Sequence, residues 1–97
     1  MLSLRVHKEA SEEIQQAWSW YQQQTEGLGD DLIRELEMAF DSITTLPDAW
    51  PKFGRRARRF VLSRFPYAVV YVASRSEIHI VAVMHQSREP GYWRKRL

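Results

Sequence analysis

Hydrophobic side chains change their spacing twice along this chain. Residues 2–6 alternate between apolar and polar side chains, which predicts a short strand. From about residue 8 the apolar side chains recur every three or four positions, which predicts an amphipathic helix that Gly27 and Gly29 end. The apolar stripe of this helix consists of Ala10, Ile14, Ala17, Trp18 and Tyr21.

The same helical spacing returns after the glycines. Asp30 or Asp31 can begin a second helix, and Pro47 ends it. Its stripe consists of Leu32, Leu36, Ala39, Phe40 and Ile43. Because the link between the two helices is short, we expect them to form an antiparallel hairpin. A loop over 47–56 follows, with two prolines and a glycine.

Strand-like alternation dominates the rest of the chain. We predict strands near 57–63, 66–73 and 77–85, with a short helical turn near 90–94. The order β-α-α-β-β-β predicts one α+β domain over residues 1–97. In this fold the helix hairpin packs on one face of a small, mainly antiparallel sheet.

Both faces of the predicted sheet carry apolar side chains. Strict alternation sets Tyr67, Val69 and Tyr71 against Ala68, Val70 and Val72, and Ile78, Ile80, Ala82 and Met84 against His79, Val81 and Val83. Two helices cover only one face, and each exposed aliphatic side chain forgoes roughly 1.5–3 kcal/mol of burial. We therefore expect the C-terminal tail, a second copy or a partner chain to cover the other face.

Charge divides the chain into two unlike halves. Residues 1–51 sum to −7 and residues 52–97 sum to +9, giving the net +2. A basic half attracts nucleic acid or an acidic protein, although it also serves solubility and attraction between the halves. The chain has no cysteine, no apolar leader and no membrane-length apolar run, so we expect a cytoplasmic protein.

Two groups of side chains are candidates for chemistry. His85 closes the last strand and Arg88 follows, so the pair could exchange a proton and hold phosphate, or could simply pin the C-terminal turn. The three histidines have no metal-ligand spacing, so we expect no metal and no cofactor. An arginine cluster favours phosphate contacts or a solvated strand edge. This cluster consists of Arg55, Arg56, Arg58, Arg59 and Arg64.

The four tryptophans differ in their expected positions. Trp18 lies on the apolar stripe and is expected in the core, whereas Trp20 lies off it and suits an interface. Trp50 is expected to pack under the loop. Trp93 either anchors the tail or belongs to a recognition surface.

Several pieces in order give the chain a family resemblance. They are Trp20-Tyr21 followed by Gly27-Leu28-Gly29, the Ile43 to Pro51 loop entry, Arg59, Arg64-Phe65-Pro66-Tyr67, Tyr71, and the ending from Val83 to Trp93. With these the chain resembles the RelE/ParE superfamily of bacterial toxins, on the ParE (plasmid-stabilisation) side. The resemblance covers nearly the whole length.

The resemblance implies a growth-arresting toxin that a cognate antitoxin neutralises. The toxin would form either a homodimer or a heterotetramer with its antitoxin. In the family the antitoxin wraps the toxin, often with a helix in the groove beside the helix hairpin. ParE-like members inhibit DNA gyrase by binding, whereas RelE-like members cleave mRNA on the ribosome. We expect an antitoxin surface that includes Trp20, Phe60, Tyr67 and Tyr71.

The sequence departs from the RelE pattern, because it has no lysine cluster and no strong general base in its strands. A gyrase inhibitor is therefore the leading hypothesis, with its target surface at Arg59, Arg64, His85, Arg88 and Trp93. The alternative is a ribosome-dependent endoribonuclease, with His85 as general acid and Arg59, Arg64 and Arg88 stabilising the transition state. A third reading is a non-toxic relic that only binds its antitoxin.

Overall fold

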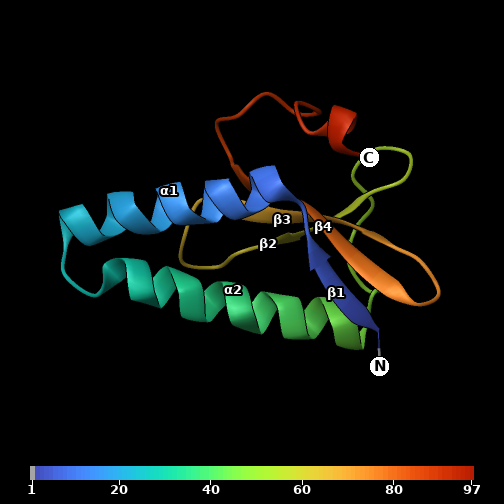
Figure 1. Ribbon diagram of the computed structural model, residues 1–97, viewed down its shortest axis with the longest axis horizontal. Coiled ribbons are helices and arrows are strands. Elements are labelled where there is room, and N and C mark those ends of the chain that lie inside the picture. The colour runs from blue at the N-terminus through green and yellow to red at the C-terminus, as the bar shows by residue number, and fades with distance from the viewer. Residues whose placement is uncertain (1) are drawn as a thin grey trace.

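Two antiparallel helices form one layer of the molecule (Figure 1). The computed structural model describes residues 2–97, with α1 over Lys8–Gln24 and α2 over Leu28–Thr45. His7 caps α1, since its Nδ1 accepts the backbone N–H of Glu9 at 3.1 Å. The predicted helix hairpin is confirmed, and its turn is short.

The two glycines of this turn have different roles. Gly27 adopts a left-handed conformation (φ 87°) and begins α2. Gly29 lies within α2, where a Cβ would meet the Trp18 carbonyl oxygen at 2.4 Å and the Gln22 side chain at 2.6 Å. The predictions that Gly29 ends the first helix and that Asp30 or Asp31 begins the second are therefore wrong. Glycine is needed at position 29 because the helices approach closely there.

Replacing Gly29 with alanine is expected to destabilise the fold by about 1–3 kcal/mol, because the added methyl group meets backbone that cannot move aside. Urea unfolding measures the change. Glu26→Ala, an exposed substitution in the same turn, is the control and should change stability by less than about 0.5 kcal/mol. Equal losses in the two variants would contradict the close approach.

Four strands form the second layer: β1 (Ser3–Val6), β2 (Arg58–Val61), β3 (Tyr67–Ala73) and β4 (Glu77–His85). Their order is β1-β4-β3-β2, and only the β1–β4 pair is parallel. The α+β fold with a mainly antiparallel sheet is confirmed. The C-terminal helical turn forms later than predicted, as the 3-10 helix η1 over Arg94–Arg96.

The helix hairpin covers one face of the sheet and encloses the main core. The buried side chains of this core are Ala10, Ala17, Leu32, Leu36, Ala39, Ile43, Leu62, Phe65, Val69, Tyr71, Ile78, Ile80 and Val83. Trp18 is not among them, because its ring stays 36% exposed and its Nε1 donates to Asp30 Oδ1 at 2.9 Å. The prediction of a core Trp18 is wrong; the indole bridges the edge of the two helices instead.

A β-bulge in β4 changes which side chains face the helices. Val70 pairs with Ala82 but Tyr71 pairs with Ile80, so Val81 is the extra residue. The strict alternation predicted for residues 78–84 is therefore broken at this point. Val83 joins the helix-facing core with Ile80, whereas Val81 and Ala82 pack on the opposite face.

The chain's own tail and loop cover the second face. Trp93 is 2% exposed and packs with Phe53 from the loop, their ring centroids 5.6 Å apart. This second core also contains Ala57, Val70, Val81, Ala82 and Met84. Of the three covers that the sequence left open, the C-terminal tail is the one observed. A second copy or a partner chain is therefore not needed to cover this face.

Candidate partner-binding site

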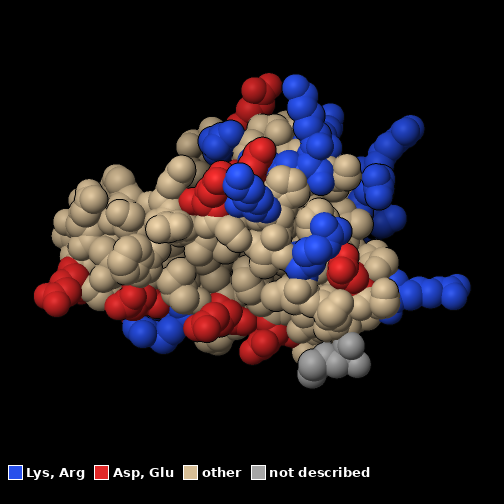
Figure 2. All heavy atoms as spheres, viewed as in Figure 1, with Lys and Arg blue, Asp and Glu red and all other residues tan. Residues whose placement is uncertain are grey.

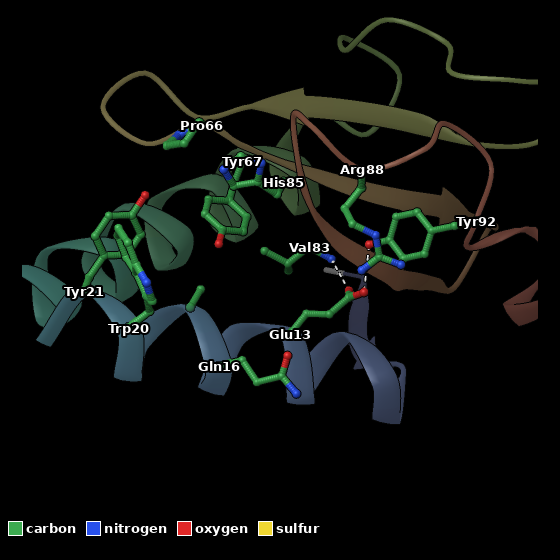
Figure 3. A pocket seen from close by; sticks show the side chains of 11 residues that line it. Glu13, Gln16, Trp20, Tyr21, Pro66, Tyr67, Val83, His85, Arg88 and Tyr92 are labelled. Atoms are coloured by element: carbon green, nitrogen blue, oxygen red, sulfur yellow. Dashed lines mark hydrogen bonds between the residues drawn. The ribbon is translucent and has the colours of Figure 1, made fainter. Parts of the chain in front are cut away.

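An open groove of about 500 Å³ lies between α1 and the ends of β3 and β4 (Figure 3). We call it the aromatic groove. It is lined by Glu13, Gln16, Ala17, Trp20, Tyr21, Pro66, Tyr67, Val83, His85, Arg88 and Tyr92. Residues from the first helix, the third and fourth strands and the tail meet here although they are far apart in sequence.

Aromatic rings form one wall of the groove. Trp20 is 56% exposed and meets Tyr21 edge to face at 5.0 Å, and Tyr21 meets Phe65 in the same way. Tyr67 packs on His85 at 5.0 Å, again edge to face. Edge-to-face contacts are among the favoured geometries of aromatic pairs and stabilise the positions of these rings. The groove therefore presents preformed apolar surface that a partner side chain can bury.

His85 enters the groove in a defined hydrogen-bonding state. Its Nδ1 accepts the backbone N–H of Ser87 at 3.0 Å and lies 2.8 Å from the Ser87 hydroxyl. Because Nδ1 is an acceptor, the neutral ring carries its proton on Nε2. The imidazole thus pins the C-terminal turn with one nitrogen and offers an N–H donor with the other.

Glu13 is the polar centre of the groove. Its Oε1 accepts the backbone N–H of Val83 at 2.9 Å, and its Oε2 accepts the Tyr92 hydroxyl at 2.7 Å. Arg96 donates to both oxygens at 3.1 and 3.0 Å, and also to the Val81 carbonyl at 3.1 Å. The β1–β4 pairing ends at Ile80, so the backbone of β4 beyond this residue has no neighbouring strand on that side. Side chains take the place of that strand as hydrogen-bond partners beside the bulge.

These contacts raise the pKa values of two side chains. Burial, with the hydrogen bond to Glu13, raises the pKa of Tyr92, so this hydroxyl stays a donor. Burial acts to lower the pKa of Arg96, but the hydrogen bond and charge of Glu13 outweigh it and the pKa is raised. The tail is therefore held by a charged, hydrogen-bonded clamp between Glu13 and Arg96.

Glu13 was missed at the level of sequence, where it counted only as part of the polar face of the helix. A signal was present, since position 13 lies three residues after Ala10 and four before Ala17, which are both buried. A carboxylate on the buried stripe of a helix needs a partner. Arg96 and Tyr92 are those partners.

The structure brings together only part of the predicted target surface. His85 and Arg88 line the aromatic groove, and the Arg88 guanidinium stacks 3.8 Å from the Tyr92 ring centroid. Arg59 pairs with Val70 on the opposite face of the sheet, where it stacks on Phe53 at 4.6 Å and borders a separate hollow with Arg88 that His85 does not line.

Arg64 also lies apart from His85. It reaches Asp31 of α2, 3.5 Å away, and borders none of the described hollows that His85 lines. The four side chains of the nuclease alternative (His85, Arg59, Arg64 and Arg88) thus do not converge on one site. Cleavage of a phosphodiester needs groups that reach the same reacting phosphate.

Three other predicted contact residues have mainly structural surroundings. Tyr71 is fully buried, and its hydroxyl donates to the Pro47 carbonyl at 2.6 Å. Phe60 is half-buried and packs on Trp50 at 4.5 Å, and Trp93 anchors the tail. Tyr71 and Trp93 therefore have no surface to offer a partner in this conformation. Trp20 and Tyr67 do, because both line the groove.

Comparison with protein-family models identifies one family. The family model described as the ParE toxin of the type II toxin–antitoxin system parDE matches residues 4–90. The chain therefore belongs to the ParE toxin family. No curated protein matched the sequence.

A solved structure has the same fold. It is described as the chromosomal ParDE TA system from P. aeruginosa, with a TM-score of 0.65 and 15% sequence identity. The match covers 88% of this chain and 96% of that one. At this identity the likeness establishes the fold.

None of the helices within residues 2–97 combines the length and apolar composition needed to cross a bilayer.

Proposed function

We propose that a cognate antitoxin neutralises this toxin by placing an apolar segment in the aromatic groove. The observation that carries the proposal is the preformed ring wall, where Trp20 is 56% exposed beside Tyr21 and Tyr67. Aromatic side chains dominate the energetics of protein interfaces. Arg88 and the Nε2 of His85 border the same groove and suit a carboxylate on the bound segment.

Replacing Trp20 with alanine is expected to weaken antitoxin binding by about 2 kcal/mol or more, roughly thirtyfold, because an exposed interface indole is lost. Calorimetric titration with the product of the adjacent reading frame measures the change. Met38→Ala removes a side chain that is 68% exposed on α2, outside the groove, and should leave affinity unchanged. Equal losses would place the antitoxin elsewhere.

We further propose that the toxin acts on DNA gyrase by binding and not by a reaction of its own. The support is the separation of the candidate nuclease side chains. Arg59 and Arg64 lie away from His85, and Glu13, the carboxylate in the groove, is engaged by Tyr92 and Arg96 of the tail.

Purified gyrase and mapped transcripts separate the candidate functions. Inhibited supercoiling with intact mRNA supports the proposal. Site-specific mRNA cuts that disappear in His85→Ala would instead support an endoribonuclease, for which the shared position of His85 and Arg88 in the groove is the favourable observation. Normal growth after induction of the chain alone, with antitoxin binding retained, would indicate a non-toxic relic.

A further inference from the structure

Unpaired basic side chains gather at the end of the molecule where the tail and the 47–57 loop meet. Figure 2 shows Lys and Arg projecting from this end, whereas Asp and Glu follow α2 along another side. The formal charges of residues 1–51 sum to −7 and those of residues 52–97 to +9. The division of charge along the sequence is therefore also a division in space. A molecule with such polarity turns one end toward an anionic partner.

The fold divides the arginine cluster that the sequence suggested. Arg58 donates to the Trp50 carbonyl at 2.7 Å, Arg59 stacks on Phe53, and Arg64 lies beside Asp31. Each of these three side chains thus has a partner within the protein. Arg55 and Arg56 are exposed and, among the residues that the structure describes, make no ion pair or side-chain hydrogen bond.

The tail supplies a third free arginine to the same place. Gly54, with φ +89°, makes the turn that presents Arg55 and Arg56, and a hollow of about 570 Å³ separates them from Arg94. Trp93 and Leu97 also line this hollow. Lys52 lies with Arg55 and Arg56 around an adjoining hollow of about 200 Å³, which Asp48 also borders. We define Lys52, Arg55, Arg56 and Arg94 as the basic end.

We propose that the basic end binds the sugar-phosphate backbone of nucleic acid. Guanidinium groups match phosphate oxygens with paired N–H donors, and three of them border one hollow here, with no ion-pair partner among residues 2–97. Asp30 and Asp31 in the first turn of α2 would repel a polyanion, which favours its approach from the basic end. This inference does not depend on which macromolecule the toxin inhibits.

An acidic protein fits this surface less well than nucleic acid does. Protein interfaces have an apolar centre, and the exposed large apolar side chains lie mostly elsewhere: of Leu4, Trp18, Trp20, Met38, Leu46, Val61 and Leu97, only Leu97 borders the basic end. Backbone binding to nucleic acid needs no such centre, because released counterions supply most of its free energy.

Fluorescence anisotropy of a labelled random-sequence duplex tests the proposal, with the full chain and salt varied between 50 and 200 mM. The double variant Arg55→Gln/Arg56→Gln is expected to reduce the slope of log K against log salt by about two, and the affinity at 50 mM by roughly a hundredfold. Arg94→Gln alone should reduce the slope by about one. Far-UV circular dichroism checks that each variant is folded.

The matched control is Arg34→Gln/Arg64→Gln, which removes the same charge beside Asp31 of α2. It should leave the slope unchanged. The proposal is overturned if the control lowers binding as much as Arg55→Gln/Arg56→Gln does. It is also overturned if polyglutamate of equal charge displaces the duplex as well as unlabelled DNA does, since the surface would then prefer acidic protein.

Discussion

Replacing Glu13 with glutamine is expected to destabilise the protein by about 3 kcal/mol. The Arg96 side chain is only 9% exposed, and the substitution removes its main counter-charge together with an acceptor for the Tyr92 hydroxyl. Glu9, 3.0 Å from Arg96 but 58% exposed, compensates only in part. In a domain of this size, with roughly 5–15 kcal/mol of total stability, such a loss is large.

Urea unfolding of Glu13→Gln, with Glu12→Gln as the matched control, measures this effect. Glu12 is the neighbouring carboxylate, is exposed and makes no side-chain hydrogen bond within residues 2–97, so its loss should change stability by less than about 0.5 kcal/mol. If the two variants unfolded at the same urea concentration, the clamp between Glu13 and Arg96 would have no stabilising role.

The order and type of the elements could be predicted because the spacing of apolar side chains is regular within each element and changes at the next. The stripe from Leu32 to Ile43 specifies a helix, and the apolar alternation of residues 67–73 specifies a strand. The ends of the helices were predicted less accurately. Gly29 was taken as a helix end because glycine is flexible, whereas it is required for its small size beside Trp18.

The pairing of distant segments could not be predicted from local pattern. The bulge at Val81 reverses the alternation of β4, and nothing in the run of apolar residues marks it. Glu13, Tyr92 and Arg96 form one unit although up to 83 residues separate them. For the same reason the arginine cluster looked continuous in sequence, and only the fold shows which members are engaged.

The groove was predicted in part. Trp20 was assigned to an interface because it lies off the apolar stripe, and it does line the groove, with Tyr67, His85 and Arg88. Tyr71 and Trp93 were assigned to contact surfaces with the family resemblance, and for Trp93 an anchoring role was left open as well, because aromatic side chains serve both cores and interfaces. Burial decides between these roles, and burial depends on the tertiary fold.

Replacing Trp93 with alanine is expected to cost about 3–5 kcal/mol, because it empties the centre of the second core. The tail would lose its anchor, and the apolar face with Val70, Val81 and Met84 would open to solvent. We therefore expect increased binding of a hydrophobic dye and faster proteolysis of residues 88–97, in addition to a lower unfolding midpoint.

Trp20→Ala is the matched control for Trp93→Ala, since both remove an indole from the same fold. Trp20 is 56% exposed and Trp93 is 2% exposed, so the control should cost less than about 1 kcal/mol and leave dye binding unchanged. The two variants should also separate by function. Trp20→Ala should weaken antitoxin binding in a stable protein, whereas Trp93→Ala should weaken it only as far as the fold is lost. A stable Trp93→Ala protein with a protected tail would show that the second face is held by contacts other than this ring.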